Sequence, residues 1–241
     1  MSDGLRLMRM PFDVRNALRI GGEVWSRRLE VDLGYLAHCR LVELFGDLAP
    51  RPFFVDSGRQ GPVIFGYTSA DQAALLAAGG AAMSESERRL ETKVIPTHFE
   101  IGTRLGFEVR VCPVVRLAKE SEGYRKGAEK DVYLRELSRL GDAVPGREEV
   151  YRRWLGERFG SAASLVRCEM KAYQQREPLF RQGRVTEGKR ERRVFERPDV
   201  TFEGVLEVRD VEGFAGHVKR GIGRHRGFGF GMVLLKRPEV G

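Results

Sequence analysis

The same order of strand-like and helix-like segments occurs twice along this 241-residue chain, and such a repeat leaves few topologies open. In the first half, Leu5–Met10 has a strand pattern. Asp32 can N-cap a helix that runs to about Gly46, with apolar residues at helical spacing. Two strands, a helix capped by Ser69 and a further strand follow at residues 53–55, 62–67, 70–78 and 93–95. This β-α-β-β-α-β order predicts a ferredoxin-like unit.

The second half repeats that order with longer connections. The expected strands and helices lie at residues 107–117, 147–159, 165–173, 200–208, 214–220 and 230–235. A long basic segment joins the third and fourth of them. The sequence therefore predicts an α+β protein with two tandem ferredoxin-like (RRM-like) domains, residues 1–100 and 101–241, the second ending in a glycine-rich loop. Residues 11–28 form a basic stretch to which the pattern assigns no shape.

The glycine-rich segment from Phe214 to Pro238 carries six Lys or Arg, two His and no acidic residue. Glycine lets the backbone approach a ligand closely, and basic side chains beside exposed N–H groups can bind phosphates. A dinucleotide-binding loop is excluded, because the order here is helix, loop, strand and the spacing is one residue too long. A helix that ends at Gly221 and continues into a glycine-rich turn is the plainer alternative. The loop glycines are Gly221, Gly223, Gly227, Gly229 and Gly231.

Charge and composition favour a polyanionic partner. The chain has 42 basic and 34 acidic residues and a pI near 9.7. The three cysteines are widely spaced, and the sequence has no zinc-ligand pattern. Because the sequence has neither a zinc-ligand pattern nor a nucleotide-binding loop, we expect no metal and no small-molecule cofactor. Because we find neither a signal peptide nor a long apolar run, we expect no membrane association and a cytoplasmic location.

Tyr35 and His38 are three residues apart, so on a helix they share one face. A phenol and an imidazole can together run acid–base chemistry without a metal. On RNA, one group would take the proton of a 2′-hydroxyl and the other would protonate the leaving 5′-oxygen. The alternative is that Tyr35 packs with its hydroxyl at the surface while His38 is simply a polar residue. Cys39 is poorly placed as a nucleophile, because adjacent helix positions point about 100° apart.

Two further basic stretches could bind nucleic acid. Residues 181–197 hold seven Lys or Arg against three Glu, and this pattern predicts a basic β-hairpin that contacts a duplex through phosphates and helix shape. A solvated hairpin tip is the alternative. Residues 124–135 form a weaker stretch, with Lys126 and Lys130 among its basic residues.

Four segments together resemble the RAMP superfamily, and most closely its CasE (Cse3) endoribonucleases, which process CRISPR RNA. The sequence from Arg220 to Leu235 is similar to that family's glycine-rich loop and last strand. Val200–Val208 resembles the strand before the last helix, Gly123–Leu134 the mid-chain basic segment, and Tyr35-x-x-His38 the first helix. The resemblance implies two ferredoxin-like domains and metal-independent cleavage of the repeat hairpin, leaving a 2′,3′-cyclic phosphate and a 5′-hydroxyl. It also implies that the product stays bound and that the partners are CRISPR repeat hairpin RNA and the other Cascade subunits.

The resemblance also implies roles for individual residues. His38 matches the catalytic histidine and Tyr35 its partner, with His38 the donor to the leaving group, although the sequence leaves that division open. RNA contacts are expected from Arg40, Lys126, Lys130, Lys189, Arg190, Arg192, Arg193, Arg224, His225 and Arg226. Two departures stand out: about twenty extra residues precede the first helix, and Cys39 takes the position after the histidine, where the family often has arginine. A non-catalytic RAMP-type RNA-binding subunit is the alternative function, and a generic RRM-like binder is more distant.

Overall fold

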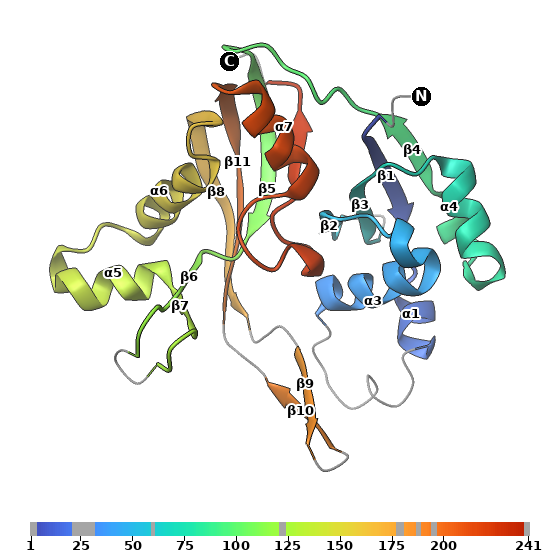
Figure 1. The fold of residues 1–241 in the computed structure, drawn as a ribbon, viewed down its shortest axis with the longest axis horizontal. Helices are drawn as coiled ribbons and strands as arrows, with labels where there is room; N and C mark the ends of the chain where they lie inside the picture. The colour runs from blue at the N-terminus through green and yellow to red at the C-terminus, as the bar shows by residue number, and fades with distance from the viewer. Residues whose placement is uncertain are drawn as a thin grey trace.

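The computed structural model describes residues 4–20, 32–58, 61–120, 124–176, 181–186, 189–193 and 197–238. The expected segment at residues 11–28 is therefore described only as far as residue 20. Over these residues the chain forms two lobes, each built on a four-stranded antiparallel sheet (Figure 1). No helix in the described ranges combines the length and apolar character needed to cross a membrane.

The first lobe has the element order expected from the sequence, with one added helix. Its sheet has the order β2-β3-β1-β4, and helices α3 and α4 pack on one face. The elements are β1 (Arg6–Pro11), α1 (Val14–Ile20), α3 (Leu33–Phe45), β2 (Phe53–Asp56), β3 (Val63–Thr68), α4 (Gln72–Gly79) and β4 (Glu91–Val94). Short 3₁₀ turns lie at Gly46–Leu48, Gly80–Ala82 and Glu87–Arg89.

The second lobe repeats the same strand order, as β12-β5-β11-β8. Its elements are β5 (Arg104–Val111), β6 (Val114–Arg116), β7 (Glu129–Asp131), α5 (Val132–Leu140), α6 (Arg147–Phe159), β8 (Ala163–Arg176), β9 (Arg181–Thr186), β10 (Lys189–Arg193), β11 (Arg197–Val208), α7 (Val211–Arg220) and β12 (Val233–Lys236). Further 3₁₀ turns are Gly141–Ala143 and η5 (Arg226–Phe228). Both sheets place the first strand beside the third and fourth, so the prediction of two ferredoxin-like units is confirmed.

Helix α3 forms where local chemistry predicts it. The Asp32 carboxylate accepts hydrogen bonds from the amides of Gly34 and Tyr35 at 2.8 and 3.3 Å, which satisfies two free N–H groups at the helix start. Gly46 ends the helix with a φ of 52°. The buried face of α3, formed by Leu36, Ala37, Leu41, Leu44 and Phe45, packs on the sheet.

Alternation along β1 connects the two lobes. Met8 and Met10 are fully buried beneath the helices of the first lobe, whereas Leu5 and Leu7 pack against the core of the second. The Tyr67 hydroxyl, from β3, donates a hydrogen bond to the Val233 carbonyl of β12 at 2.8 Å. The lobes therefore share an apolar interface as well as a hydrogen bond.

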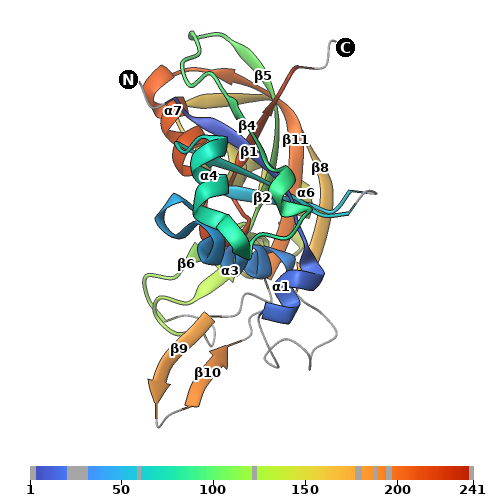
Figure 2. The same ribbon diagram turned by 90° about the vertical axis from the view of Figure 1, so that its right-hand side faces the viewer.

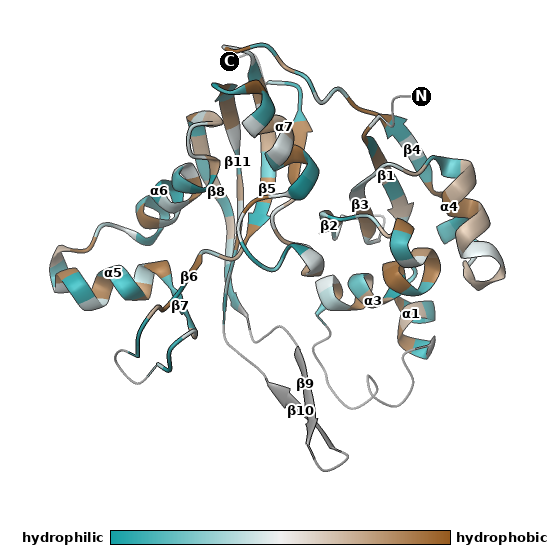
Figure 3. Cartoon of the chain, in the orientation of Figure 1, coloured by the Kyte–Doolittle hydropathy of each residue, from teal (hydrophilic) through white to brown (hydrophobic). Residues whose placement is uncertain are grey.

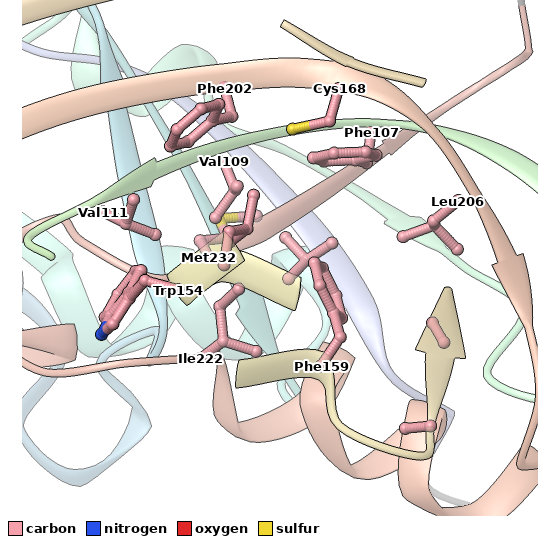
Figure 4. Packing of buried hydrophobic residues seen from close by; sticks show 14 of the residues in the cluster. Phe107, Val109, Val111, Trp154, Phe159, Cys168, Phe202, Leu206, Ile222 and Met232 are labelled. Atoms are coloured by element: carbon pink, nitrogen blue, oxygen red, sulfur yellow. The ribbon is translucent and has the colours of Figure 1, made fainter. Parts of the chain in front are cut away.

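The second core lies between its sheet and helices α6 and α7 (Figure 4). Phe107 and Val109 of β5 and Phe202 of β11 are at most 1% exposed and pack with Trp154 and Phe159 of α6. In Figure 3, α4 is apolar around most of its circumference, whereas α5 alternates between apolar and hydrophilic residues. Of α5, only Val132 is buried.

Several sequence expectations were wrong in detail. The caps differ, because Asp71 and not Ser69 accepts the hydrogen bond that begins α4. The single strand expected over 107–117 is interrupted at Cys112 and Pro113, because proline cannot continue the ladder. Helix α5 was not expected. The last strand begins at Val233, three residues later than expected, because Gly231 has a φ of 79°.

The basic segment does form the expected hairpin. Strands β9 and β10 pair antiparallel, with Arg190 opposite Val185, Arg192 opposite Gln182 and Arg193 opposite Arg181. In Figures 1 and 2 this hairpin extends away from both lobes, on the side of the molecule where α3 lies. A basic strand pair therefore stands beyond the helix that carries Tyr35 and His38.

Candidate active site

Tyr35 and His38 lie together in the first two turns of α3. Their ring centroids are 6.4 Å apart and the ring planes are inclined by 44°. Both residues are intermediate in exposure, so neither is sealed in the core. The Asp32 cap fixes where the helix begins and so fixes the position of both side chains.

Phe228 of the glycine-rich loop contacts both rings. It stacks on Tyr35 with centroids 5.9 Å apart and planes inclined by 21°, and it meets the His38 ring edge-on at 5.1 Å. The loop lies directly on α3, since a Cβ atom added to Gly34 would be 2.4 Å from the Phe228 carbonyl oxygen. The structure thus brings together two features that the sequence presents separately, the helix pair and the glycine-rich loop.

The glycine-rich loop is built to bring Phe228 to that place. Gly221 caps α7 and has a φ of 70°, and Gly223, Gly229 and Gly231 are also left-handed. The Ile222 amide donates to the Gly231 carbonyl at 2.8 Å, and the Gly231 amide donates to the Arg110 carbonyl of β5 at 2.6 Å. Gly227 has open space around it and needs no such freedom. The helix-cap alternative for Gly221 is confirmed, and the turn beyond it is pinned to β5.

Other basic residues of this loop are engaged within the protein. The Arg224 Nε donates to Glu129 Oε1 at 2.6 Å, and His225 Nε2 lies 2.8 Å from Glu129 Oε2, with only 3% of the His225 side chain exposed. Arg226 donates to the Arg220 carbonyl at 2.9 Å. In this arrangement the His225 ring is buried against Glu129, whereas Arg226 is exposed.

Arg40 is also engaged within the protein. It is 1% exposed, and its guanidinium makes two hydrogen bonds to Glu87, of 2.9 and 2.6 Å, and one of 2.7 Å to the Ala82 carbonyl. Glu43 accepts a further bond at 2.9 Å. Arg40 therefore fastens α3 to the connection between α4 and β4, and its charge is paired in the interior and not presented at the surface.

The remaining expected contacts divide by exposure. Lys126 is exposed between β6 and β7. Lys130 is 7% exposed and donates to the Ser138 hydroxyl at 2.8 Å, so it is largely buried in this arrangement. Backbone pairing alone places the expected basic residues of β10, Lys189, Arg190, Arg192 and Arg193, on the hairpin.

The electrostatics favour a neutral imidazole. Burial lowers the pKa of His38, and the nearby Arg51 guanidinium lowers it further, so the ring is uncharged at neutral pH. Burial raises the pKa of the adjacent Cys39 thiol, against a hydrogen bond with Tyr35. A protonated thiol is a poor nucleophile, in keeping with the unfavourable direction expected for Cys39.

Sequence reasoning missed three features of this site. The contact between Phe228 and Gly34 was not predicted, because neither local sequence pattern indicates that the two lobes meet there. Arg51, which follows the helix, has no local pattern that would predict its place near His38. A cavity of about 400 Å³ also lies between the lobes, where Leu33 and Phe54 approach the bonded pair Arg110 and Asp199.

Comparisons with known proteins agree with this fold. A family model described as CRISPR associated protein matches residues 7–237. A search among curated protein sequences finds no match. The fold is similar to CRISPR endoribonuclease Cse3 bound to a 19-nucleotide RNA, with a TM-score of 0.65 and 18% identity over 98% of this chain and 100% of that one.

Two other solved structures have the same fold. Cse3 of Thermus thermophilus, bound to an RNA representing a pre-cleavage complex, has a TM-score of 0.63 and 18% identity over 97% and 99% of the two chains. A chain of a CRISPR RNA-guided surveillance complex has a TM-score of 0.55 and 18% identity over 97% and 99%. Since the family model spans nearly the whole sequence, the chain belongs to the CRISPR-associated protein family.

Proposed function

We propose that this protein is a metal-independent endoribonuclease that cuts CRISPR repeat hairpins in precursor RNA and stays bound to the product as a Cascade subunit. The observation that carries the proposal is the Tyr35–His38 pair at the start of α3, held against Phe228 from the other lobe. The similarity in fold to RNA-bound Cse3 supports the substrate class. The similarity to a chain of a surveillance complex supports the partners.

The reaction needs one base and one acid. The base removes the proton of the 2′-hydroxyl, the 2′-oxygen attacks the adjacent phosphorus, and the bond from phosphorus to the 5′-oxygen breaks. The acid protonates that leaving oxygen, so the products carry a 2′,3′-cyclic phosphate and a 5′-hydroxyl. We assign the base to His38, because its lowered pKa keeps it neutral, and the acid to Tyr35, because a phenol keeps its proton at neutral pH. This division is the reverse of the one the family resemblance implies.

Cleavage of a repeat hairpin in EDTA tests the proposal. We expect stoichiometric protein to cut the RNA once, giving a 3′ fragment that polynucleotide kinase labels without prior phosphatase treatment, since its 5′ end is a hydroxyl. A matched RNA with a single 2′-deoxy sugar before the cut must stay intact, because it lacks the nucleophile. Tight binding without cleavage in EDTA would support the alternative, a non-catalytic RNA-binding subunit.

The basic hairpin supplies a second prediction. Replacing Arg192 and Arg193 with alanine is expected to weaken hairpin-RNA binding and to flatten its salt dependence. Each lost phosphate contact lowers the slope of log K against log salt by about 0.7 to 0.9. The measurement is a titration at several salt concentrations.

A charge-matched control is available for this experiment. Arg88 and Arg89 lie in the 3₁₀ turn between α4 and β4, away from the hairpin, and their replacement with alanine removes the same charge. We expect this control to leave the slope within about 0.3 of the unmodified protein, since general electrostatic attraction falls off beyond the ~10 Å Debye length. Equal slopes in all three proteins would show that Arg192 and Arg193 make no phosphate contact.

A further inference from the structure

Glu129 of the short strand β7 joins three basic side chains from distant parts of the sequence. Its carboxylate accepts from Arg224 at 2.6 Å, lies 2.8 Å from the His225 Nε2, and contacts the guanidinium of Arg197. The Glu129 side chain is 9% exposed and that of Arg197 is 12% exposed. Because water has little access to these side chains, each electrostatic contact is stronger than at the surface, and losing one would destabilise the cluster.

The surroundings of the Glu129 carboxylate favour its ionised form. Burial by itself raises the pKa of Glu129, but the hydrogen bonds and charges of His225, Arg197 and Arg224 outweigh it and lower the pKa to about 2. The group is therefore ionised throughout the neutral range. A neutral amide in its place would keep the shape and one acceptor oxygen but lose the attraction.

One turn of chain connects this cluster to the candidate active site. His225 has a φ of 60°, an uncommon conformation for a residue with a side chain, and its buried ring is held by Glu129. The Phe228 amide donates to the His225 carbonyl at 2.8 Å, which closes the turn. The conformation at His225 thus sets where Phe228 lies against Tyr35 and His38.

The other end of the cluster reaches the start of β11, the strand that follows the basic hairpin in the sequence. Arg197 is the first residue of β11, where the chain returns from β10, and it pairs with Arg176 at the end of β8. A single carboxylate therefore contacts Arg197, where β11 begins at the base of the hairpin, and the loop that carries Phe228.

We propose that Glu129 is a positioning residue that fastens the base of the basic hairpin to the glycine-rich loop and so holds Phe228 against the Tyr35–His38 pair. This role rests on the proposed function, because its catalytic consequence requires that the pair cuts RNA. Glu129 does not touch the reacting atoms. It acts through the His225 turn, and its loss would leave Phe228 free to shift on α3.

The variant Glu129→Gln tests this role. We expect the single-turnover cleavage rate at saturating protein to fall about tenfold to a hundredfold, since a displacement near 1 Å at a reacting site costs about that much. The affinity of the protein for the repeat-hairpin RNA should change less than threefold. In a Phe228→Ala background, Glu129→Gln should add little further loss, because both changes remove the same contact.

Asp131→Asn is the matched control on the same strand. Asp131 is also a carboxylate paired with an arginine, Arg147 at 3.1 Å, and it accepts from the Tyr151 hydroxyl at 2.8 Å, but its bonds lead to α5 and α6. We expect a similar fall in melting temperature with an unchanged saturated rate. Rate losses that simply follow the melting temperatures of the two variants would overturn the positioning role.

A measurement without RNA separates the two proposals. The ring of Phe228 lies 5.1 Å from that of His38, so it shifts the proton resonances of the imidazole. In Glu129→Gln these resonances should move toward their positions in Phe228→Ala, and in Asp131→Asn they should stay. Unmoved resonances in Glu129→Gln would refute the positioning role, whereas moved resonances in a protein that never cuts RNA would refute only the proposed function.

Discussion

The variant His38→Ala is expected to lose at least a hundredfold in single-turnover cleavage of a repeat hairpin. General acid–base groups typically contribute about 10² to 10⁴ in rate, and His38 is half of the pair on which the proposed chemistry depends. The affinity for the repeat-hairpin RNA should change less than threefold, because the phosphate contacts are expected from the protein's basic β9–β10 hairpin on the other lobe. The measurement is the cleavage rate at saturating protein, in EDTA, beside a filter-binding or anisotropy titration.

His98→Ala is the matched control for this experiment. His98 is exposed in the connection between β4 and β5, so its loss removes an imidazole without touching α3. We expect it to cleave at the unmodified rate. Full cutting by His38→Ala would contradict the catalytic role.

The pH profile of the unmodified protein distinguishes the two assignments of acid and base. His38 has a pKa below its ordinary value near 6.5, so as the base it should be active once deprotonated. The second-order rate constant should then rise with pH through a value below 6.5 and level off above it. A rate that falls across the same range would instead make His38 the acid, which is the division implied by the family resemblance.

Replacing Arg40 with methionine is expected to destabilise the protein by about 3 to 5 kcal/mol, because it leaves the fully buried Glu87 carboxylate without its charged partner. The double variant Arg40→Met, Glu87→Leu should recover most of that loss, since neither charge then remains in the interior. Urea unfolding followed by circular dichroism measures both variants.

The exposed pair of Arg89 and Glu85 provides the comparison. Their side chains are 73% and 92% exposed, so Arg89→Met should change the unfolding free energy by less than about 1 kcal/mol. If Arg40→Met unfolds like the unmodified protein while its RNA affinity drops, then Arg40 is an RNA contact after all and its buried pairing contributes little.

The ends of several helices could be predicted from the sequence, because they depend on residues close together in the chain. Asp32 caps α3, and Gly46 and Gly221 end their helices, because each of these rules involves neighbours within four residues. Ser69 failed as a cap because Asp71, two residues later, offers a stronger acceptor for the same task. Helix α5 was missed because its cap, Asp131, stands within a basic stretch and only Val132 of the helix is buried.

The parts that could not be predicted depend on contacts across the chain. Arg40 follows His38 by two residues and has the character of an RNA contact, but its partner Glu87 lies 47 residues away. In the sequence Phe228 is one aromatic residue in a glycine-rich turn, and its contacts with Tyr35 and His38 exist only in the folded arrangement of the two lobes. Periodicity and spacing carry no information about such pairings, so the sequence identified the catalytic candidates without the residue that packs against both of them.

The contact between Phe228 and α3 also sets when the cluster of Tyr35, His38 and Phe228 can be completed during synthesis. Phe228 follows Tyr35 by 193 residues. At about 5 to 20 residues per second, the ribosome needs roughly 10 to 40 seconds to extend the chain from one to the other. A nascent first lobe therefore displays Tyr35 and His38 for that interval without the aromatic ring that later packs against them, and translation itself delays completion of the cluster.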